Sequence, residues 1–391
     1  MQIKQKQNCG ICLSTSLKRV REFPKLPLSD TYTTLEDQSV PPEIDLNLLY
    51  CDCCGHVQLG DLIDPITLYG SNYHFRTGES AVARAGTQFH INFLERNSRN
   101  HTFNHALDIG CNDLHLLKCI ENKVIARTGI DPLLPPGKAL QEGIQTIGGI
   151  FENLNLVKSL DTPPDLVVCR HTLEHIWEPR IVLETMMDVA TNDALFLIEI
   201  PSLDVLLDRF RIDQIFHQHL QYFSLTSLTR LIEEVGGYLV DYEYNYHDWG
   251  ALVVAFRRGR KSHCKISHFF STDEAKIDST FKVFETKMAA SQKTIRALSG
   301  TIYGYGAAQM LPVIAYHLKT DLSELKAILD DDPQKDGLTY SNLPVKIMAP
   351  HKANDFDESS VLLTAVDNAS PILKQLLYKR PRRIIYPMNI I

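Results

Sequence analysis

The chain has 391 residues, of which 44% are hydrophobic and 22% charged, so it can bury a sizeable core and is long enough for two or three domains. Its net charge of -7 disfavours nucleic acids and anionic membranes as partners, because both attract a clustered basic surface. The sequence shows neither an apolar run long enough to span a membrane nor the apolar core of a signal peptide. We therefore expect a cytoplasmic globular protein that acts on small molecules.

Two Cys-x-x-Cys pairs near the N-terminus predict a metal site. Pairs with this spacing can place four thiolates tetrahedrally around zinc, and a site closed by four sulfurs has a structural role. The predicted ligands are Cys9, Cys12, Cys51 and Cys54. Cys53 is the spare, although an exchange with Cys54 stays open, as does an ordinary core of free thiols. Gly10 and Gly55 are expected to relieve backbone strain in the two turns.

From about residue 79 the pattern changes to alternating helix and strand signals. A helix is predicted around residues 82–94. Strands are predicted at residues 105–109, 123–130, 166–168, 195–200 and 252–256. Such alternation is typical of a largely parallel, doubly wound sheet, which binds its ligands beyond the carboxyl ends of the strands.

The ends of the first two strands carry the residues of a nucleoside site. The first strand ends in Asp108-x-Gly110, and the second ends in Asp131, about twenty residues later, as a ribose-binding carboxylate requires. Gly110 lets the backbone pass close to a ligand, and Asp131 can accept hydrogen bonds from two vicinal hydroxyls. A dinucleotide-binding turn would continue as Gly-x-Gly-x-x-Gly, a series that fails at Cys111 and Asn112. An adenosyl group fits better than a pyrophosphate.

This stretch resembles the first motif of class I methyltransferases, with Leu114 where the family usually has a further glycine. The run from Cys169 to Ile176 is similar to the family's fourth-strand motif, although helix-start capping and surface charge would also explain it. The resemblance implies S-adenosylmethionine as cofactor and a mostly architectural role for Glu174 and His175. The cofactor-binding residues that it implies are Asp108, Gly110, Cys111, Asn112, Asp131, Arg170 and His171.

The best candidate for chemistry is the run from Asp213 to Ser224. It concentrates proton-handling groups, since His217 and His219 flank a polar residue and aromatic residues follow them. Two histidines at this spacing could also bind a metal, but Asp213 is the one carboxylate beside them in the sequence. Purely structural histidines stay open as well.

Taken in chain order, these features resemble the sugar-nucleotide C-methyltransferases that act on 4-keto deoxysugars. The resemblance covers the two cysteine pairs, the segment from Tyr73 to Gly78, the cofactor motif, the histidine run and a C-terminal Gly-Tyr-Gly-Ala. It makes His219 the general base. The catalytic candidates are therefore His219, His217, Gln218, Tyr73 and Tyr222.

The chemistry explains why a base is wanted here. A positioned base can remove the proton α to a ketone, and the resulting enolate can attack a sulfonium methyl group in line. A neutral imidazole is suited to this near pH 7. Members of the family read Tyr-His-Glu-His where this chain reads Phe216-His217-Gln218-His219, so a phenol and a carboxylate have become a phenyl and an amide.

The C-terminal third predicts a long amphipathic helix over residues 271–298 and then a second α/β unit. Its strands are predicted at residues 301–303, 325–329, 361–364 and 383–386. The turn from Gly304 to Ala308 could present backbone N–H groups to an anion, or it could serve close packing of strand and helix. In the resembling family this region helps to bind the nucleotide half of the substrate.

We therefore predict an α/β protein of three regions. These are a zinc-binding domain over residues 1–78, a Rossmann-like class I methyltransferase domain over 79–260, and a smaller Rossmann-like substrate-binding domain over 261–391. The predicted reaction is C-methylation of a dTDP- or GDP-linked 4-keto-deoxysugar, with S-adenosylmethionine as cofactor and zinc as structural metal. Sugar O-methylation and an NAD-linked oxidation at Gly304-x-Gly306 stay as alternatives. The sequence leaves open whether the chain is a monomer or a dimer.

Overall fold

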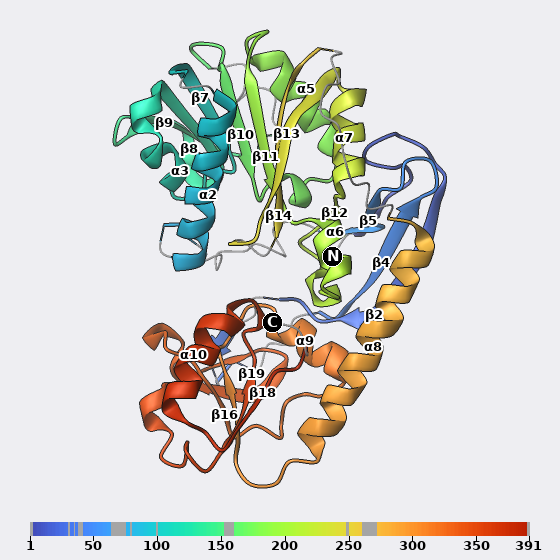
Figure 1. Ribbon diagram of the computed structural model, residues 1–391, viewed down its shortest axis with the longest axis vertical. Coiled ribbons are helices and arrows are strands. Elements are labelled where there is room, and N and C mark those ends of the chain that lie inside the picture. The colour runs from blue at the N-terminus through green and yellow to red at the C-terminus, as the bar shows by residue number, and fades with distance from the viewer. Residues whose placement is uncertain are drawn as a thin grey trace. The chain divides into compact units, whose positions relative to one another are not determined.

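Figure 1 shows the computed structural model of the chain. The structure describes residues 3–29, 32–34, 36–37, 42–63, 76–78, 80–98, 101–151, 160–247, 250–259 and 272–388. By their contacts the residues form two compact units, each built from noncontiguous segments. Unit 1 comprises Met1–Val20, Leu48–Val205 and Gln218–Asp273, and unit 2 comprises Arg21–Asn47, Leu206–His217 and Glu274–Ile391. The bounds of the three predicted domains stay predictions.

A seven-stranded sheet forms the centre of unit 1, in the order β13-β14-β11-β10-β7-β8-β9 (Figure 1). Strands β8, β7, β10 and β11 are parallel to one another, whereas β9, β14 and β13 pair with their neighbours in antiparallel fashion. The bounds are β7 Phe103–Ile109, β8 Val124–Gln141, β9 Ile144–Gly148, β10 Leu166–Arg170, β11 Leu195–Ile200, β13 Gly237–Asn245 and β14 Ala251–Arg258.

The strand order of this sheet reverses between β7 and β10. The chain passes from β7 to β8 on one side and returns to β10 on the other. In doubly wound sheets such a switch point opens the ligand crevice outside the carboxyl ends of the strands. The predicted α/β class and the predicted location of the site both agree with this topology.

The strands predicted for unit 1 are all present, but the sequence pattern does not predict β9 and β13. It also ends β8 at Ile130, whereas the strand continues and forms a hairpin with β9 whose register shifts between Asp131 and Pro136. Prolines hide this hairpin from a pattern-based prediction, because proline removes ladder hydrogen bonds and usually marks an edge or an end. The outer residues of the hairpin are exposed.

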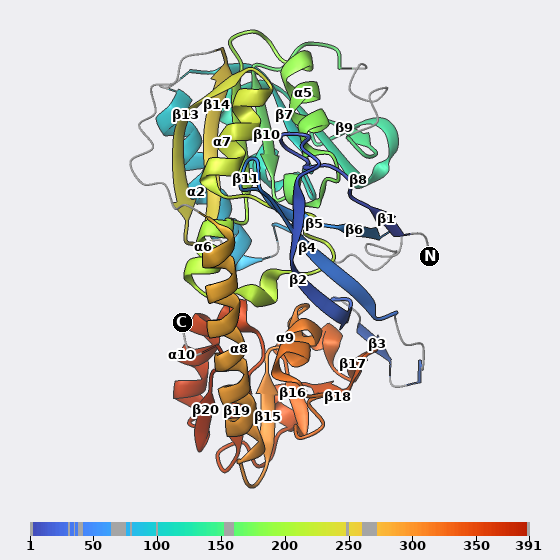
Figure 2. The ribbon, with the colours of Figure 1, turned by 90° about the vertical axis from the view of Figure 1, so that its right-hand side faces the viewer.

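Helices cover both faces of the sheet, and successive residues of each strand point to opposite faces. One core cluster joins α2 and α3 to Leu166, Val168 and Leu195, and a second joins α5 and α7 to Val167 and Phe196. Figure 2 shows α7 in front of the sheet and α2 behind it. The helix bounds are α2 Ala81–Ser98, α3 His115–Cys119, α5 Pro179–Val189, α6 Leu203–Asp208 and α7 Leu225–Glu234.

Short strands from the N-terminal segment complete unit 1. Strand β1 (Ile3–Gln5) pairs with β6 (Asp61–Ile63). A four-stranded sheet has the order β12-β5-β4-β2. Its bounds are β2 Leu17–Leu26, β4 Ile44–Cys51, β5 Val57–Leu59 and β12 Gln221–Tyr222. Strand β12 lies within the histidine run, and it pairs with β5 in antiparallel fashion.

Unit 2 contains a second seven-stranded sheet, in the order β20-β19-β15-β16-β18-β17-β3. The first five strands are parallel, and β17 and β3 add an antiparallel edge. The strand bounds are β3 Tyr32–Thr34, β15 Ile302–Tyr305, β16 Ala327–Leu329, β17 Leu338–Tyr340, β18 Leu343–Met348, β19 Ser360–Leu363 and β20 Arg383–Ile385. The helices are α8 Glu274–Arg296, α9 Leu311–Leu318 and α10 Ala369–Lys379.

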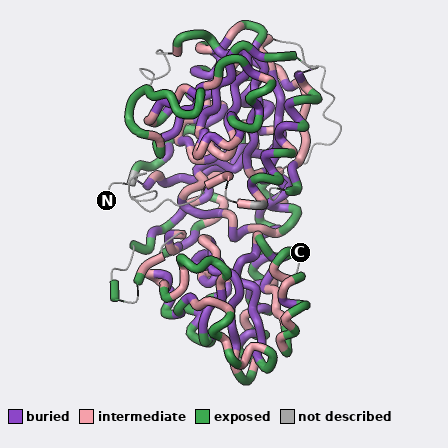
Figure 3. The backbone as a smooth tube through the Cα atoms, turned by 90° about the vertical axis from the view of Figure 1, so that its left-hand side faces the viewer, coloured by how far each residue is buried: buried purple, intermediate pink, exposed green. Residues whose placement is uncertain are grey.

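The predicted Rossmann-like character of the C-terminal region is confirmed by its parallel strands. All four predicted strands and the long helix are present. In both units the central strands of the sheet, β10 and β11 in unit 1 and β15 and β19 in unit 2, are deeply buried (Figure 3). Within the described ranges, the structure has no helix that is both long enough and apolar enough to cross a membrane.

Candidate functional site

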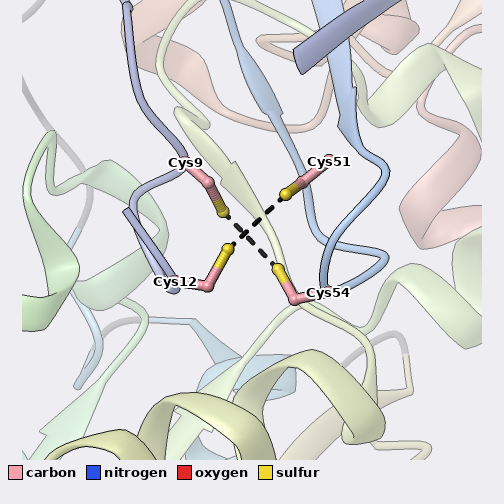
Figure 4. A group of neighbouring side chains, drawn as sticks. All are labelled: Cys9, Cys12, Cys51 and Cys54. Carbon is pink, nitrogen blue, oxygen red and sulfur yellow. Dashed lines mark hydrogen bonds between the residues drawn. The ribbon is translucent and has the colours of Figure 1, made fainter. Parts of the chain in front are cut away.

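Four cysteine side chains of unit 1 converge on one point (Figure 4). The Sγ atoms of Cys9, Cys12, Cys51 and Cys54 all lie within 4.8 Å of one another. Two of the separations, Cys9 to Cys54 and Cys12 to Cys51, are 3.6 Å. A tetrahedral zinc ion with bonds of about 2.3 Å separates its sulfur ligands by about 3.8 Å. The cluster therefore has the donors and the spacing of a structural zinc site, while Cys53 is exposed.

Two tight turns hold these sulfurs. Leu13 and Gly55 each donate a backbone N–H to the carbonyl of the first cysteine of their pair, over 3.1 and 2.8 Å. Gly55 is left-handed with φ 71°, as predicted, but the left-handed residue of the first turn is Leu13, with φ 60°. The role predicted for Gly10 is therefore wrong. A Cβ at Gly10 would lie 3.2 Å from the proline ring that begins α5, so this glycine allows close packing.

Residues that follow the second cysteine pair are hydrogen-bonded to the histidine run. Leu59 donates its backbone N–H to the carbonyl of Leu220 over 2.9 Å. The buried ring of His56, two residues after the second cysteine pair, lies with Nε2 2.9 Å from Oε1 of Gln221. Since an amide oxygen only accepts, His56 donates this bond. The metal site thus supports the segment that carries His219.

The turn after β7 is hydrogen-bonded to β8 at the point where the parallel pairing of the two strands ends. Gly110 donates its N–H to the carbonyl of Ile130 over 2.8 Å, and Asn112 donates its N–H to Oδ2 of Asp131 over 2.8 Å. The other oxygen of Asp131 accepts the N–H of Leu133, also over 2.8 Å. Each carboxylate oxygen has a second lone pair. Asp131 can therefore hold the turn and still accept hydrogen bonds from ribose hydroxyls.

Three residues of this turn are left-handed, Gly110 with φ 75°, Asn112 with φ 49° and Leu114 with φ 65°. A Cβ on Gly110 would come 1.9 Å from Oγ1 of Thr172, so the loop after β10 requires glycine there. Leu114 stands where the resembling family usually has glycine, and its conformation costs a non-glycine residue about 1–2 kcal/mol. Its side chain is buried, so apolar packing offsets the strain.

Asp108 lies near the carboxyl end of β7 and is buried. Burial raises the pKa of its carboxyl to about 7, and the nearby Arg170 guanidinium opposes the rise. A carboxyl in this range ionises readily when a cation is placed beside it. The cationic amino-acid end of a methionine-derived cofactor would supply such a charge, so Asp108 suits the role that its motif position implies.

Arg170 belongs to a buried polar network at the carboxyl ends of β10 and β11. Its Nε donates to Oε2 of Glu199 over 2.5 Å, and its Nη1 donates to Thr87 over 3.1 Å. Asn245 donates to Oε1 of Glu199 over 2.7 Å, and Nδ1 of His90 lies 3.0 Å from Oε2. Burial alone would raise the pKa of Glu199, but Arg170 and His90 hold it well below its usual range. The network fixes Arg170 in place.

The segment before α2 docks on the cofactor turn. Thr77 donates its N–H to Oδ1 of Asn112 over 3.2 Å, and Gly78 donates its N–H to Oδ2 of Asp113 over 2.7 Å. Tyr73, a predicted catalytic residue earlier in this segment, lies outside the described residues. Cys111 is buried, and its sulfur lies against Gly129 of β8, where an added Cβ would be 2.6 Å from it.

Glu174, His175 and His219 lie together just beyond the carboxyl end of β10. Donor atoms of the three side chains all lie within 4.8 Å of one another, and the rings of the two histidines are 5.0 Å apart. Oε1 of Glu174 is 3.9 Å from Nε2 of His175 and 3.6 Å from Nδ1 of His171. Two residues taken from the sequence as architectural thus lie against the predicted base, and His171 faces the same carboxylate.

Electrostatics set the protonation states of this cluster. The pKa of His219 is lowered to about 3, first by burial and then by His175, so its ring is neutral at physiological pH and keeps a lone pair. The side chain of Glu174 is 2% exposed. Although burial alone would raise its pKa, His171 and His175 lower it, so this carboxylate is ionised. A neutral base and an anion are therefore adjacent.

The remaining residues of the histidine run have different surroundings. His217 is buried in unit 2, where Nε2 lies 3.3 Å from the carbonyl of Ile44. Tyr222 is buried in β12, with its ring 6.5 Å from that of His219. Gln218 contributes its backbone carbonyl, which accepts a hydrogen bond from His175 over 2.8 Å. Ser224 caps α7 by accepting the N–H of the third helical residue over 3.1 Å.

The glycine turn after β15 in unit 2 has its own hydrogen bonds. Gly306 donates its N–H to the last carbonyl of β16 over 2.7 Å, and Ala308 donates to the carbonyl of Gly306 over 3.0 Å. Ala307 donates to Oδ2 of Asp330 over 2.6 Å. A Cβ on Gly306 would come 2.3 Å from Cβ of Ala365. Of the two explanations for this turn, close packing is the one that its contacts favour.

The matches to known families agree with the geometry of both the nucleotide site and the metal site. Residues 83–241 match the model of a methyltransferase domain. Residues 9–69 match a model described as "Putative zinc binding domain". The chain has a methyltransferase domain and a zinc-binding domain. The methyltransferase domain contains Asp108, the turn after β7 and Asp131. The zinc-binding domain contains the four clustered cysteines. The predicted cofactors, S-adenosylmethionine and zinc, are thus those of the domains present.

One curated relative of the methyltransferase is the C-methyltransferase NovU from Streptomyces niveus. It is 26% identical over 250 residues, which are 63% of this chain and 59% of the relative. The chain therefore matches about three-fifths of the length of that relative. Its substrate and full activity are matters for a proposal.

Two solved structures are similar to part of the chain. The N-methyltransferase NodS from Bradyrhizobium japonicum WM9, in complex with S-adenosyl-L-homocysteine, is 15% identical over 46% of this chain and 90% of that chain, with a TM-score of 0.35. An amino pentose methyltransferase from Micromonospora echinaspora, with bound S-adenosylmethionine, is 14% identical over 48% of this chain and 99% of that chain, with a TM-score of 0.36.

Proposed function

We propose that the protein is an S-adenosylmethionine-dependent C-methyltransferase that acts on a nucleotide-linked 4-keto-deoxysugar. The observation that carries the proposal is the environment of His219. This neutral imidazole is partly exposed and lies beside an ionised carboxylate, in the same unit as the cofactor turn. The C-methyltransferase NovU among the relatives supports methylation at carbon. We place the enzyme in the cytoplasm, where a reducing environment keeps cysteine ligands available for zinc.

The proposed reaction needs a carbon nucleophile. The bound cofactor supplies an electrophilic methyl group. His219 takes the proton from the carbon next to the ketone, so the C–H bond breaks and its electron pair enters an enolate. The enolate carbon would then form a new C–C bond to the methyl group while the methyl–sulfur bond breaks, and the electron pair of that bond would stay on sulfur in S-adenosylhomocysteine. The proton stays on imidazole until it is released to solvent. Asp131 and the turn at Asn112 hold the nucleoside so that the two carbons are in line.

Deuterium exchange tests the role of His219. Wild-type protein should exchange the α-proton of a dTDP- or GDP-linked 4-keto sugar in D₂O and, with S-adenosylmethionine, add one methyl group to that carbon. His219→Asn should lose both activities by about 10²–10⁴-fold, which is the usual contribution of a general base. It should still bind S-adenosylhomocysteine. His101→Asn, at an exposed histidine of the same unit, is the matched control. Unchanged turnover in His219→Asn would refute the assignment.

The same measurement separates the alternatives. A sugar O-methyltransferase would transfer the methyl group without exchanging the α-proton. An NAD-linked oxidoreductase would bind NADH through the turn at Gly306, where the backbone N–H of Ala307 already donates to the carboxylate of Asp330. Gly306→Val is a poor probe of that turn because of its close contact with Ala365. Direct calorimetry with NADH on the intact chain tests it instead, and we expect no binding.

A further inference from the structure

Glu174 lies among three imidazole rings, those of His171, His175 and His219. Its side chain is 2% exposed, and its Oε2 has no hydrogen-bond partner among the residues that the structure describes. Buried carboxylates that serve only the fold are normally saturated with hydrogen bonds. The unsatisfied oxygen of Glu174 therefore needs another explanation. The negative charge of this carboxylate provides it.

The tautomer of His175 makes the contact with Glu174 informative. Nδ1 of His175 lies 2.8 Å from the backbone carbonyl of Gln218. A carbonyl oxygen can only accept, so Nδ1 carries the hydrogen. In the neutral ring Nε2 then has the lone pair, and this is the atom that lies 3.9 Å from Oε1 of Glu174. A proton that arrived at Nε2 would be placed beside the carboxylate.

The charges around His219 also indicate that Glu174 favours a protonated imidazole. The groups that act on it are His175, Glu174 and His171, in that order, and Glu174 is the one that favours its protonated form. The amide of Gln218 carries no charge, and the phenol of Tyr222 is neutral at physiological pH. Among the described groups facing the ring, the stabilisation of an imidazolium therefore falls to Glu174.

We propose that Glu174 is a positioning residue of the methyl-transfer site, which acts through His175 to stabilise the positive charge that proton abstraction leaves on His219. The inference rests on the proposed function. The proton lost by the sugar carbon is held by the imidazole pair, the electron pair of the C–H bond goes to the enolate, and no further reactant is needed. Glu174 does not touch the substrate in this scheme.

Nitrogen NMR of the imidazole rings tests the inference without any substrate. In full-length, zinc-loaded protein, Glu174→Gln should shift the titration of the His219 ring to lower pH, because an anion that favours the protonated ring is removed. Glu184→Gln, which alters an exposed glutamate on α5, should leave it unchanged. Identical imidazole titrations in Glu174→Gln and wild type would overturn the inference.

Kinetics supply the second readout. Glu174→Gln should slow α-proton exchange and methylation by about 10–100-fold and move the acidic limb of the kcat/KM profile to lower pH, while the affinity for S-adenosylhomocysteine stays within twofold of wild type. Glu174→Asp, which keeps the charge, should recover part of the rate. If wild type acts on no 4-keto sugar, the proposed function fails, and the NMR result alone decides the role of Glu174.

Two further outcomes are decisive. If Glu174→Gln does not fold, the side-chain carboxyl of Glu174 in wild type is titrated by carbon NMR. A shared titration step with His175 supports the inference, and independent steps overturn it. Elemental analysis covers the competing explanation, since two histidines and a glutamate could also bind a divalent metal. A second metal ion per chain that disappears in Glu174→Gln would replace the inference.

Discussion

The backbone N–H of Asn112 donates to Oδ2 of Asp131 over 2.8 Å, and this bond joins the turn after β7 to β8. Asp131→Ala removes this bond and the proposed acceptor of two ribose hydroxyls. Hydrogen bonds to a charged group contribute about 1.5–3 kcal/mol each, so we expect calorimetry to show at least about a hundredfold loss of S-adenosylhomocysteine affinity. Asp161→Ala, at an exposed aspartate of the same unit, is the control. Equal affinities in the two variants would contradict the assignment.

Cofactor binding should depend on pH through Asp108. Its pKa is raised to about 7 by burial, so the carboxyl is largely protonated at pH 6 and largely ionised at pH 8. The ammonium group of the ligand favours the ionised carboxylate beside it, and affinity for S-adenosylhomocysteine should therefore rise about tenfold over this interval. In Asp108→Asn the rise should disappear. An equal rise in the variant, measured by calorimetry at both pH values, would assign the effect to another group.

The same pKa has a consequence for the ligand-free fold. Since the folded state holds the proton of Asp108 more tightly than the unfolded state, stability contributed by this residue is complete below about pH 4 and is lost as the pH rises to about 7. Asp108→Asn should remove that loss. Urea unfolding at pH 5 and pH 8 should therefore show a smaller difference in the variant than in wild type, and an unchanged difference would argue against it.

The zinc ligands can be tested by one pair of substitutions. Cys54→Ser should lose the metal, because the sulfur of Cys54 belongs to the cluster, whereas Cys53→Ser should retain it, because Cys53 is exposed. Elemental analysis of the purified proteins measures the zinc content, and thermal melting measures the accompanying loss of stability. The opposite result would exchange the two cysteines.

The buried partner of Arg170 should matter for stability. Glu199→Gln removes the carboxylate that accepts a hydrogen bond from Nε of Arg170, and removing one member of a buried pair costs about 3–5 kcal/mol. Glu184→Gln removes the partner of Arg180 in an exposed pair and should cost at most about 1 kcal/mol. Urea unfolding measures both. A Glu199→Gln cost no larger than that of the surface variant would show that the network contributes little.

Much of the cofactor site was predictable because its residues follow strands. Asp108 and Asp131 lie where the parallel pairing of β7 and β8 ends, so the pattern of the sequence places them together. Glu199 offered a further signal, as a charged residue inside an otherwise apolar strand, which implies a buried counterion. Its partners His90 and Asn245 come from distant elements, and no local pattern connects them.

The cluster of Glu174, His175 and His219 was predictable only in part. His219 was recognisable from its neighbours in sequence, but the contact of its ring with His175 depends on how β10 and β12 are placed in the fold. The role of Gly10 was misjudged for a similar reason, since its requirement comes from the start of α5 and not from its own turn. At Leu114 the motif predicts glycine, because the position is left-handed. The structure has a left-handed leucine there, whose side chain is well buried.

The pairing of β5 with β12 limits how this enzyme can be shortened. A truncated chain that began at α2 would keep every residue of the cofactor turn, and its cofactor affinity could look normal. It would nevertheless present β12 as an unpaired edge, without the backbone bond from Leu59 and without the His56 contact to Gln221. The zinc-binding domain thus supports the segment that carries His219, the proposed base, and a chelator that removed zinc would be expected to inhibit the enzyme without binding at the methyl donor.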